Sequence, residues 1–197
     1  MNRKALKNPA IRVNCRFVAF LTVIFALIGS HTVALDRDTP FESIYGGTLS
    51  LSQWEGQAIL VVNTASMCAF TDQYRELQAL YDRYRDDGLV VLAVPSDDFN
   101  QELASDAEVK EFCELVYGLD MPMTVITRVK GRDAHPFFRS LRQDAGFTPR
   151  WNFNKVLLDG DGSLVATYAS RVSPLSETIT RRVESVLANL ADERIRP

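Results

Sequence analysis

Histidine and cysteine are scarce in this sequence, which has two histidines and three cysteines among 197 residues. Only one histidine, His135, follows the first 34 residues, and no cysteines lie at the spacing of a zinc site. This composition argues against a metal site, and against any cysteine–histidine catalysis that does not use His135. Because His135 stands before Pro136 at the start of a predicted helix, we expect it to be structural. No cofactor is expected.

Acidic residues are missing from the start of the chain, where the first acid is Asp36. A run of 13 apolar residues, broken only by Thr22, occupies residues 17–29, and small residues follow up to Ala34. The basic residues before it are Arg3, Lys4, Lys7, Arg12 and Arg16. A basic start, a short apolar run and a small-residue exit are typical of a secretory signal. We therefore predict that residues 1–34 are a cleaved signal and that the protein is periplasmic or secreted.

An uncleaved membrane anchor is the alternative for this segment, and a helix buried in the domain is a third possibility. As a helix, 13 residues extend over about 20 Å, which is short of the ~30 Å hydrocarbon core of a bilayer. The length therefore favours cleavage, and no stable membrane contact is expected afterwards. Cys15 lies within this segment and is treated as incidental.

The remainder of the chain, residues 35–197, is acidic. The five basic residues of the first segment leave 17 basic and 25 acidic residues, a net charge of −8. Such a surface argues against nucleic acid and anionic lipid as partners.

Hydrophobic periodicity predicts one undivided α/β domain over residues 35–197. The predicted strands are residues 58–64, 89–94, 123–129, 156–159 and 163–168, and the predicted helices are residues 71–87, 105–117, 134–144 and 174–190. A capping box opens the second helix at Ser105, and Asp159-Gly160-Asp161-Gly162 predicts a β-hairpin. This order predicts a thioredoxin-like sandwich with an inserted helix between its βαβ and ββα halves.

Cys68 lies where the first predicted strand passes into the first predicted helix. Backbone N–H groups and the helix dipole favour a thiolate at such a position. A free cysteine can equally be a small buried hydrophobe, so a structural role remains open. Thr71 occupies the second position of a Cys-x-x-Cys pair, which excludes a local dithiol. The Pro and Thr that precede a peroxiredoxin cysteine are also absent.

Five motifs in order resemble the glutathione peroxidase family, with cysteine in place of selenocysteine. They are NTASMCAFTDQY at 63–74, GLVVLAVPS at 88–96, FNQE at 99–102, AHPFF at 134–138 and WNFNK at 151–155. The similarity covers roughly residues 39–190. It implies a thiol peroxidase that reduces hydrogen peroxide and organic hydroperoxides through a sulfenic acid on Cys68.

The resemblance also implies that Gln101, Trp151 and Asn152 assist Cys68. Their N–H groups could donate to the sulfur, hold the peroxide and stabilise the departing oxyanion. Taken alone, Trp151 would more often be a core residue and Asn152 a turn residue. The assignment of Gln101 rests on less, because one residue rather than two separates it from Phe99. Asn100 is the alternative donor.

Cys113 lies on the second predicted helix, where its spacing from Val109 and Phe112 also fits a buried structural cysteine. The resemblance implies a resolving thiol that condenses with the sulfenic acid of Cys68. The two Cα atoms must then approach within about 7 Å, and a larger initial separation would require the helix to unwind.

A thioredoxin-like protein or glutathione would then reduce the disulfide, and the two-cysteine arrangement favours the protein donor. Two other classes of function stay open. A peroxide sensor or disulfide relay protein would use the same cysteines with slow turnover. A non-catalytic domain would hold them in a permanent bridge.

Overall fold

Two fully buried strands, β3 (Ala58–Thr64) and β4 (Leu89–Pro95), pair in parallel. Their nearly continuous apolar sequences suit strands that are covered on both faces. β5 (Lys155–Leu158) pairs antiparallel with β3, and β6 (Leu164–Tyr168) pairs antiparallel with β5. The sheet order is therefore β4-β3-β5-β6. The computed structural model describes residues 35–195.

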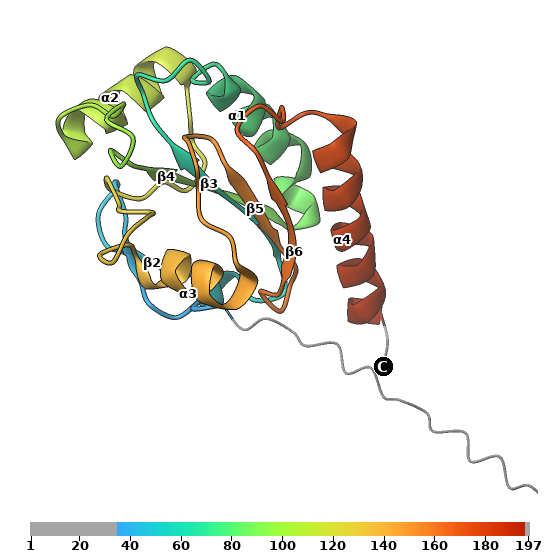
Figure 1. The fold of residues 1–197 in the computed structure, drawn as a ribbon. Coiled ribbons are helices and arrows are strands. Elements are labelled where there is room, and N and C mark those ends of the chain that lie inside the picture. The colour runs from blue at the N-terminus through green and yellow to red at the C-terminus, as the bar shows by residue number, and fades with distance from the viewer. Residues whose placement is uncertain (1–34, 196–197) are drawn as a thin grey trace, which may run out of the picture. The chain divides into compact units, whose positions relative to one another are not determined.

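Helices cover both faces of this sheet, as Figure 1 shows. They are α1 (Gln73–Tyr84), α2 (Asp106–Tyr117), α3 (Pro136–Ala145) and α4 (Glu177–Ile195). Leu60 and Val62 of β3 belong to the hydrophobic cluster that contains the buried residues of α1 and α4. Ile59 and Val61 belong to a second cluster, which includes Phe137 of α3. Because successive side chains of a strand point to opposite faces, β3 contributes to both cores.

The termini of two helices follow their predicted signals closely. Ser105 Oγ accepts a hydrogen bond from the N–H of Glu108 at 3.3 Å, which confirms the capping box of α2. Gly118 ends this helix in the left-handed conformation at φ 64°. Gly88 does the same at φ 105° after α1 and the short 3-10 helix η2 (Arg85–Asp87).

Other boundaries differ from the prediction. α1 begins at Gln73 instead of residue 71, because the preceding residues form 3-10-like turns such as Tyr74 N–H to Thr71 O at 3.0 Å. α4 begins at Glu177 and continues to Ile195, five residues beyond the predicted end. Three short elements had no clear signal in the sequence, because each is only two to four residues long. They are the strands β1 (Phe41–Glu42) and β2 (Thr48–Leu49) and the 3-10 helix η1 (Leu51–Trp54).

The predicted strand at residues 123–129 is wrong. Only two isolated bridges form there, between Met123 and Ala93 and between Thr124 and Ser43. The hydroxyl groups of Thr124 and Thr127 both donate to the carbonyl oxygen of Val125, at 2.8 and 2.7 Å. These side-chain hydrogen bonds compete with a strand ladder and turn the chain.

Residues 1–34 lie outside the described residues. The cleaved signal, the alternative of a membrane anchor and the incidental role of Cys15 therefore stay predictions. Within residues 35–195, no helix combines the length and the apolar character that crossing a membrane requires.

Candidate active site

Cys68 lies in the turn between β3 and α1, and Thr71 fixes that turn. The Oγ1 atom of Thr71 accepts from the N–H of Cys68 at 3.1 Å and donates to the carbonyl oxygen of Ala65 at 3.1 Å. The N–H of Thr71 also donates to the carbonyl oxygen of Cys68 at 3.0 Å. Thr71, which stands where a Cys-x-x-Cys pair would have its second cysteine, therefore stabilises the turn.

The sulfur of Cys68 is nearly buried, with the residue only 7% exposed. The N–H of Phe70 donates to this sulfur at 3.5 Å, and within residues 35–195 it is the one hydrogen bond that Sγ accepts. Since α1 begins later than predicted, at Gln73, a turn N–H contacts the sulfur rather than an N–H of the helix itself. One backbone N–H is still aimed at the sulfur, where it would favour a thiolate.

Gln101 and Asn152 come together beside the Cys68 turn. The carbonyl oxygen of Gln101 accepts from the N–H of Met67 at 2.9 Å, and its Oε1 accepts from Nδ2 of Asn152 at 3.0 Å. Asn100 adopts φ 55°, and this left-handed residue changes the chain direction immediately before Gln101. The structure thus brings Gln101 to the turn that carries Cys68, despite its shortened spacing from Phe99. The amide of Asn152 points to Gln101 and not to the sulfur.

Trp151 is a surface residue, 41% exposed, so it is not the core residue that tryptophan often is. Its ring contacts Phe99, with 5.5 Å between ring centroids, and its carbonyl oxygen accepts from Nδ2 of Asn63 at 3.0 Å. In the part of the chain that the structure describes, the indole N–H has no hydrogen-bond partner. Asn152 is fully buried, and its Oδ1 is unpaired among the same residues. Both side chains therefore retain groups that a substrate could use.

Cys113 is fully buried on α2 and packs in the same hydrophobic cluster as Cys68. Burial raises the pKa of the Cys113 thiol to about 12, although the Tyr74 hydroxyl partly opposes this effect. Both cysteines are free thiols.

The contacts of His135 are structural. Its Nδ1 accepts from the N–H of Phe137 at 3.3 Å at the start of α3, and its ring stacks on Phe41.

Glu102 also shapes the site, although the sequence argument did not single it out. Its Oε1 accepts from the N–H of Ser66 at 3.0 Å and from the N–H of Leu103 at 2.9 Å. Burial raises the pKa of this carboxyl group. Glu102 thereby ties the segment after β4 to the Cys68 turn. Its position directly after Gln101 in FNQE was an available signal.

Lys155 is the second residue that the sequence argument missed. It is fully buried on β5, and its Nζ donates to Val172 O at 2.7 Å, to Ser170 O at 3.2 Å and to Gln73 Oε1. Burial lowers the pKa of its ammonium group to about 7. A lysine in a buried strand is rare unless it is paired, which could have marked it.

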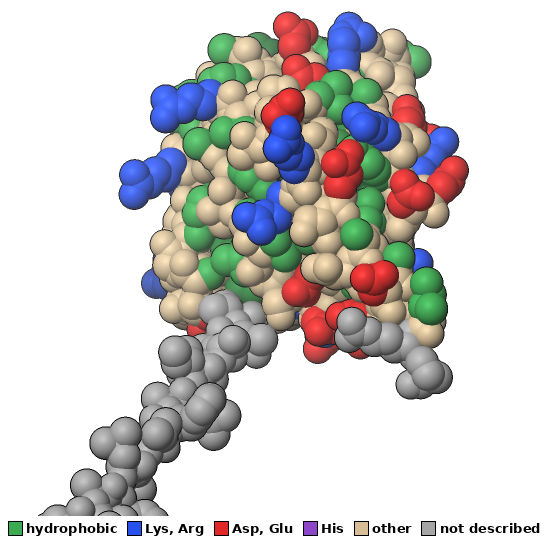
Figure 2. Space-filling model, turned by 90° about the vertical axis from the view of Figure 1, so that its right-hand side faces the viewer, with side chains coloured by type: hydrophobic (Ala, Val, Ile, Leu, Met, Phe, Trp, Pro, Cys, Tyr) green, Lys and Arg blue, Asp and Glu red, His purple; other side chains and the backbone are tan. Residues whose placement is uncertain are grey.

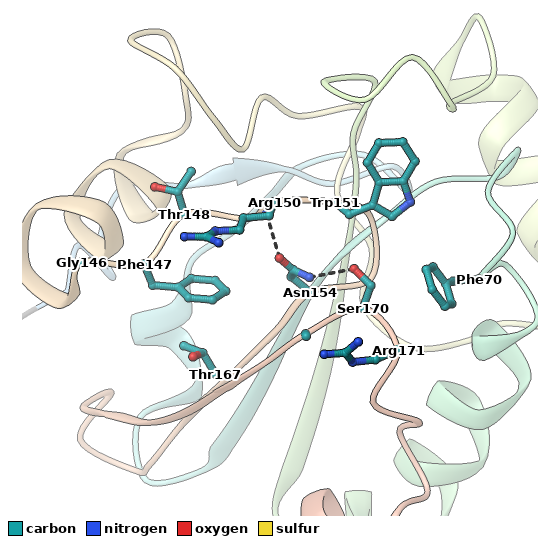
Figure 3. A pocket seen from close by; sticks show the side chains of 11 residues that line it. Phe70, Gly146, Phe147, Thr148, Arg150, Trp151, Asn154, Thr167, Ser170 and Arg171 are labelled. Atoms are coloured by element: carbon teal, nitrogen blue, oxygen red, sulfur yellow. Dashed lines mark hydrogen bonds between the residues drawn. The ribbon is translucent and has the colours of Figure 1, made fainter.

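A cavity of about 760 Å³ lies next to the turn of Cys68 and reaches Trp151. Its lining residues are Phe70, Gly146, Phe147, Thr148, Arg150, Trp151, Asn154, Thr167, Ala169, Ser170 and Arg171. Figure 3 shows Phe70 and Trp151 on one side of this space and Phe147 on the other. Within residues 35–195, no cluster of three His, Cys, Asp or Glu side chains could hold a metal ion.

Residues 38–142 match the family model described as glutathione peroxidase. The chain belongs to the glutathione peroxidase family. The matched range contains Cys68, Gln101 and Cys113 and ends before Trp151. A glutathione peroxidase homolog of Halalkalibacterium halodurans is 44% identical over 137 residues, which cover 67% of this chain and 87% of the relative. Members of this family are oxidoreductases that act on peroxides, so the chain is a thiol peroxidase.

Two further comparisons support this family and the fold. A hydroperoxy fatty acid reductase of Synechocystis is 38% identical over 153 residues, covering 72% of this chain and 89% of the relative. The crystal structure titled Trgpx in apo form has a TM-score of 0.61 and 28% identity over 79% of this chain and 97% of that one. The predicted thioredoxin-like α/β fold is confirmed. The individual roles of Cys68, Gln101, Trp151, Asn152 and Cys113 stay predictions.

Proposed function

We propose that this protein is a two-cysteine peroxidase in which Cys68 attacks the peroxide. The thiolate sulfur bonds to one peroxide oxygen, the O–O bond breaks, and the second oxygen leaves as water or an alcohol after taking a proton. Cys68 becomes a sulfenic acid and the peroxide is reduced. The observation that carries this proposal is the nearly buried Cys68 sulfur, with a backbone N–H aimed at it and Gln101 and Asn152 joined beside its turn.

Gln101, Asn152 and Trp151 are proposed to hold the peroxide and its departing oxygen. Preformed N–H donors at a site shielded from water stabilise charge that develops in a transition state. The free indole N–H of Trp151 supports this role. The Gln101–Asn152 hydrogen bond fixes both amides before substrate arrives.

Cys113 is proposed to resolve the sulfenic acid. Its thiolate attacks the Cys68 sulfur, an S–S bond forms and the S–O bond breaks, and the oxygen leaves as water. Since burial raises the pKa of Cys113 to about 12, this thiol is poorly ionised in the resting protein at neutral pH. α2 must therefore expose Cys113 or supply a base before the attack.

A dithiol protein of the thioredoxin type is the proposed reductant, with glutathione as the less favoured donor. Two thiols of the donor are oxidised to a disulfide while the Cys68–Cys113 disulfide is reduced to two thiols. The proposed site of action is the periplasm or the exterior of the cell. Intact-mass analysis of exported protein tests this: loss of residues 1–34 is expected, and a mass that includes them would contradict it.

Steady-state peroxide consumption with a thioredoxin system tests the catalytic cycle. We expect the wild-type protein to complete many turnovers and the Cys68→Ser variant to complete none. The Cys113→Ser variant should reduce one equivalent of peroxide and then show no sustained turnover with thioredoxin. Stoichiometric oxidation of the wild-type protein without turnover would instead indicate a sensor or relay. A stable Cys68–Cys113 disulfide that resists mild reductant, with no activity, would indicate a structural bridge.

A further inference from the structure

A chain of hydrogen bonds connects the buried Lys155 of β5 to the sulfur of Cys68. The ammonium group of Lys155 donates to Oε1 of Gln73, and the N–H of Gln73 donates to the carbonyl oxygen of Phe70 at 2.9 Å. The N–H of Phe70 in turn donates to the Cys68 sulfur at 3.5 Å. A strand residue far from Cys68 in the sequence is thus linked to the reacting atom.

The side chain of Gln73 is held at both of its polar atoms. While Oε1 accepts from Lys155, Nε2 donates to the carbonyl oxygen of Ser170 at 2.7 Å. Only one orientation of this amide fits, because a flipped amide would set its donor against the ammonium group and its acceptor against a carbonyl oxygen. Gln73 is buried and is the first residue of α1. The start of α1 is therefore fixed to β5 and to the segment after β6.

This link reaches Phe70 at a place where the chain has no helical support. Phe70 precedes α1, and its carbonyl oxygen accepts from the N–H of Gln73. Within residues 35–195, the N–H of Phe70 forms the one hydrogen bond that the Cys68 sulfur accepts. A hydrogen bond to the sulfur favours the thiolate, which is the reactive form of cysteine. Releasing Gln73 should therefore loosen the donor on which the thiolate depends.

The surroundings of Lys155 keep this link in place in both of its protonation states. Burial lowers the pKa of the ammonium group to about 7, and the carboxylate of Glu76 on α1 acts in the opposite direction. The neutral amine retains two N–H donors for three acceptors. The carbonyl oxygen of Ser170 also accepts from Gln73, so the amine can release it and still donate to Gln73 and Val172.

We propose that Lys155 and Gln73 are positioning residues for the peroxidase reaction. They hold Phe70 so that its N–H supports the Cys68 thiolate while the sulfur attacks the peroxide. This inference rests on the proposed role of Cys68 as the attacking thiol. Both residues act through Phe70, since the hydrogen bond to the sulfur comes from its N–H.

The test breaks the link at each of the two residues and follows the oxidation of Cys68 by hydrogen peroxide in stopped flow, from pH 5 to pH 10. Lys155→Met and Gln73→Met remove the polar groups and keep side chains of similar length. With a looser donor, the profile of rate against pH should move upward by roughly half a unit to one unit. Each variant should then react about three- to tenfold more slowly at pH 6, while the limiting rate at high pH changes little. The double variant should match the single ones, because the same link is lost once.

Lys110→Met on α2 and Gln78→Met on α1 are the matched controls and should keep the wild-type profile. Wild-type profiles in both test variants would overturn the proposal. An equal loss of rate at every pH would indicate general damage and would overturn it too. So would rate losses that multiply in the double variant, or a shift in only one of the two single variants, since either would show that no common chain connects them.

Gln73→Met leaves the charge of Lys155 in place, so it decides the question even where Lys155→Met fails to fold. Failure of the proposed function gives a different result. If hydrogen peroxide leaves Cys68 of the wild-type protein as a thiol, the catalytic role of Cys68 fails. Normal oxidation of the wild-type protein, with unshifted profiles in the variants, refutes the positioning link alone.

Discussion

Single side chains hold the Cys68 turn in its observed form. Thr71 bonds the N–H of Cys68 and the carbonyl oxygen of Ala65, while Glu102 accepts from the N–H of Ser66. These contacts replace the helical hydrogen bonds that the turn lacks. Position 71 therefore matters for the shape of the site, although it carries no thiol.

Thr71→Val should destabilise this turn, because the isosteric side chain leaves the N–H of Cys68 buried without a partner. We expect the free energy of unfolding to fall by about 1–3 kcal/mol, the usual cost of a buried unpaired donor. Urea denaturation measures the change. Thr178→Val, at an exposed position of α4, is the control and should change stability by less than about 0.5 kcal/mol.

Gln101→Ala should lower kcat/KM for hydrogen peroxide by roughly 10²-fold, the typical effect of removing one donor to a developing oxyanion. The substitution also removes the acceptor that orients Asn152. Stopped-flow measurement of the first oxidation step gives the rate. The matched control is Gln143→Ala on the exposed surface of α3. An unchanged rate in the Gln101 variant would remove this residue from the site.

At the scale of elements, α2 carries Cys113 on a helix whose two ends are well defined by Ser105 and Gly118. Val109 and Cys113 are the two fully buried residues of this helix, Phe112 and Tyr117 are partly buried, and Leu115 and Val116 are exposed. Few buried apolar contacts allow a segment to open at low cost in free energy. α2 is therefore the element that we expect to move during resolution.

Formation of the Cys68–Cys113 disulfide should accelerate by about tenfold per pH unit between pH 7 and pH 8. Only the thiolate attacks the sulfenic acid, and the pKa of Cys113 lies above this range both when buried, at about 12, and when exposed, at about 8.5. Mass spectrometry of samples quenched after one equivalent of peroxide follows the disulfide. A rate independent of pH would contradict rate-limiting attack by a Cys113 thiolate.

Across the whole molecule, Lys155 connects β5 to the first residue of α1 and to the segment after β6. One buried ammonium group thus joins three regions around the sheet. Charges on the outside follow another pattern. Figure 2 shows acidic and basic side chains interspersed on the face that it presents, without a large patch of one sign.

The stability of the protein should rise with pH above pH 7 through Lys155. The pKa of this group is about 7 in the folded protein and about 10.4 when unfolded, so the unfolded chain binds more protons between these values. The contribution to the free energy of unfolding then increases with pH, by up to about 1.4 kcal/mol per unit. Urea denaturation at pH 7, 8 and 9 measures the slope.

Lys155→Met should reduce that slope, and it should also destabilise the protein at pH 9, because the buried oxygen acceptors around it lose the two N–H donors of the neutral amine. Lys110→Met, a less buried lysine of α2, is the control and should keep the wild-type slope. Equal slopes in the wild-type protein and the Lys155 variant would show that Lys155 does not carry the effect.

The amino-acid sequence by itself determined the order of the main elements, the capping of α2 and the family to which the chain belongs. These depend on local patterns: apolar periodicity, glycine in left-handed positions, and short motifs around Cys68 and Trp151. Residues 123–129 could not be predicted this way, because threonine hydroxyls there compete with the strand that their β-branched neighbours favour. The start of α1 at Gln73 could not be predicted exactly either, because the same residue types suit the preceding turn and the first turn of a helix.

Only the tertiary structure decided how distant residues meet. It placed Gln101 against Asn152, tied Glu102 to the Cys68 turn, and buried Lys155 among oxygens from the start of α1 and the segment after β6. It also set Arg150 and Arg171 in one cavity beside Phe70. None of these pairs is close in sequence. Their contacts arise because the packing of β3, β4 and β5 brings the loops at the strand ends together, and burial there then fixes which polar groups must pair.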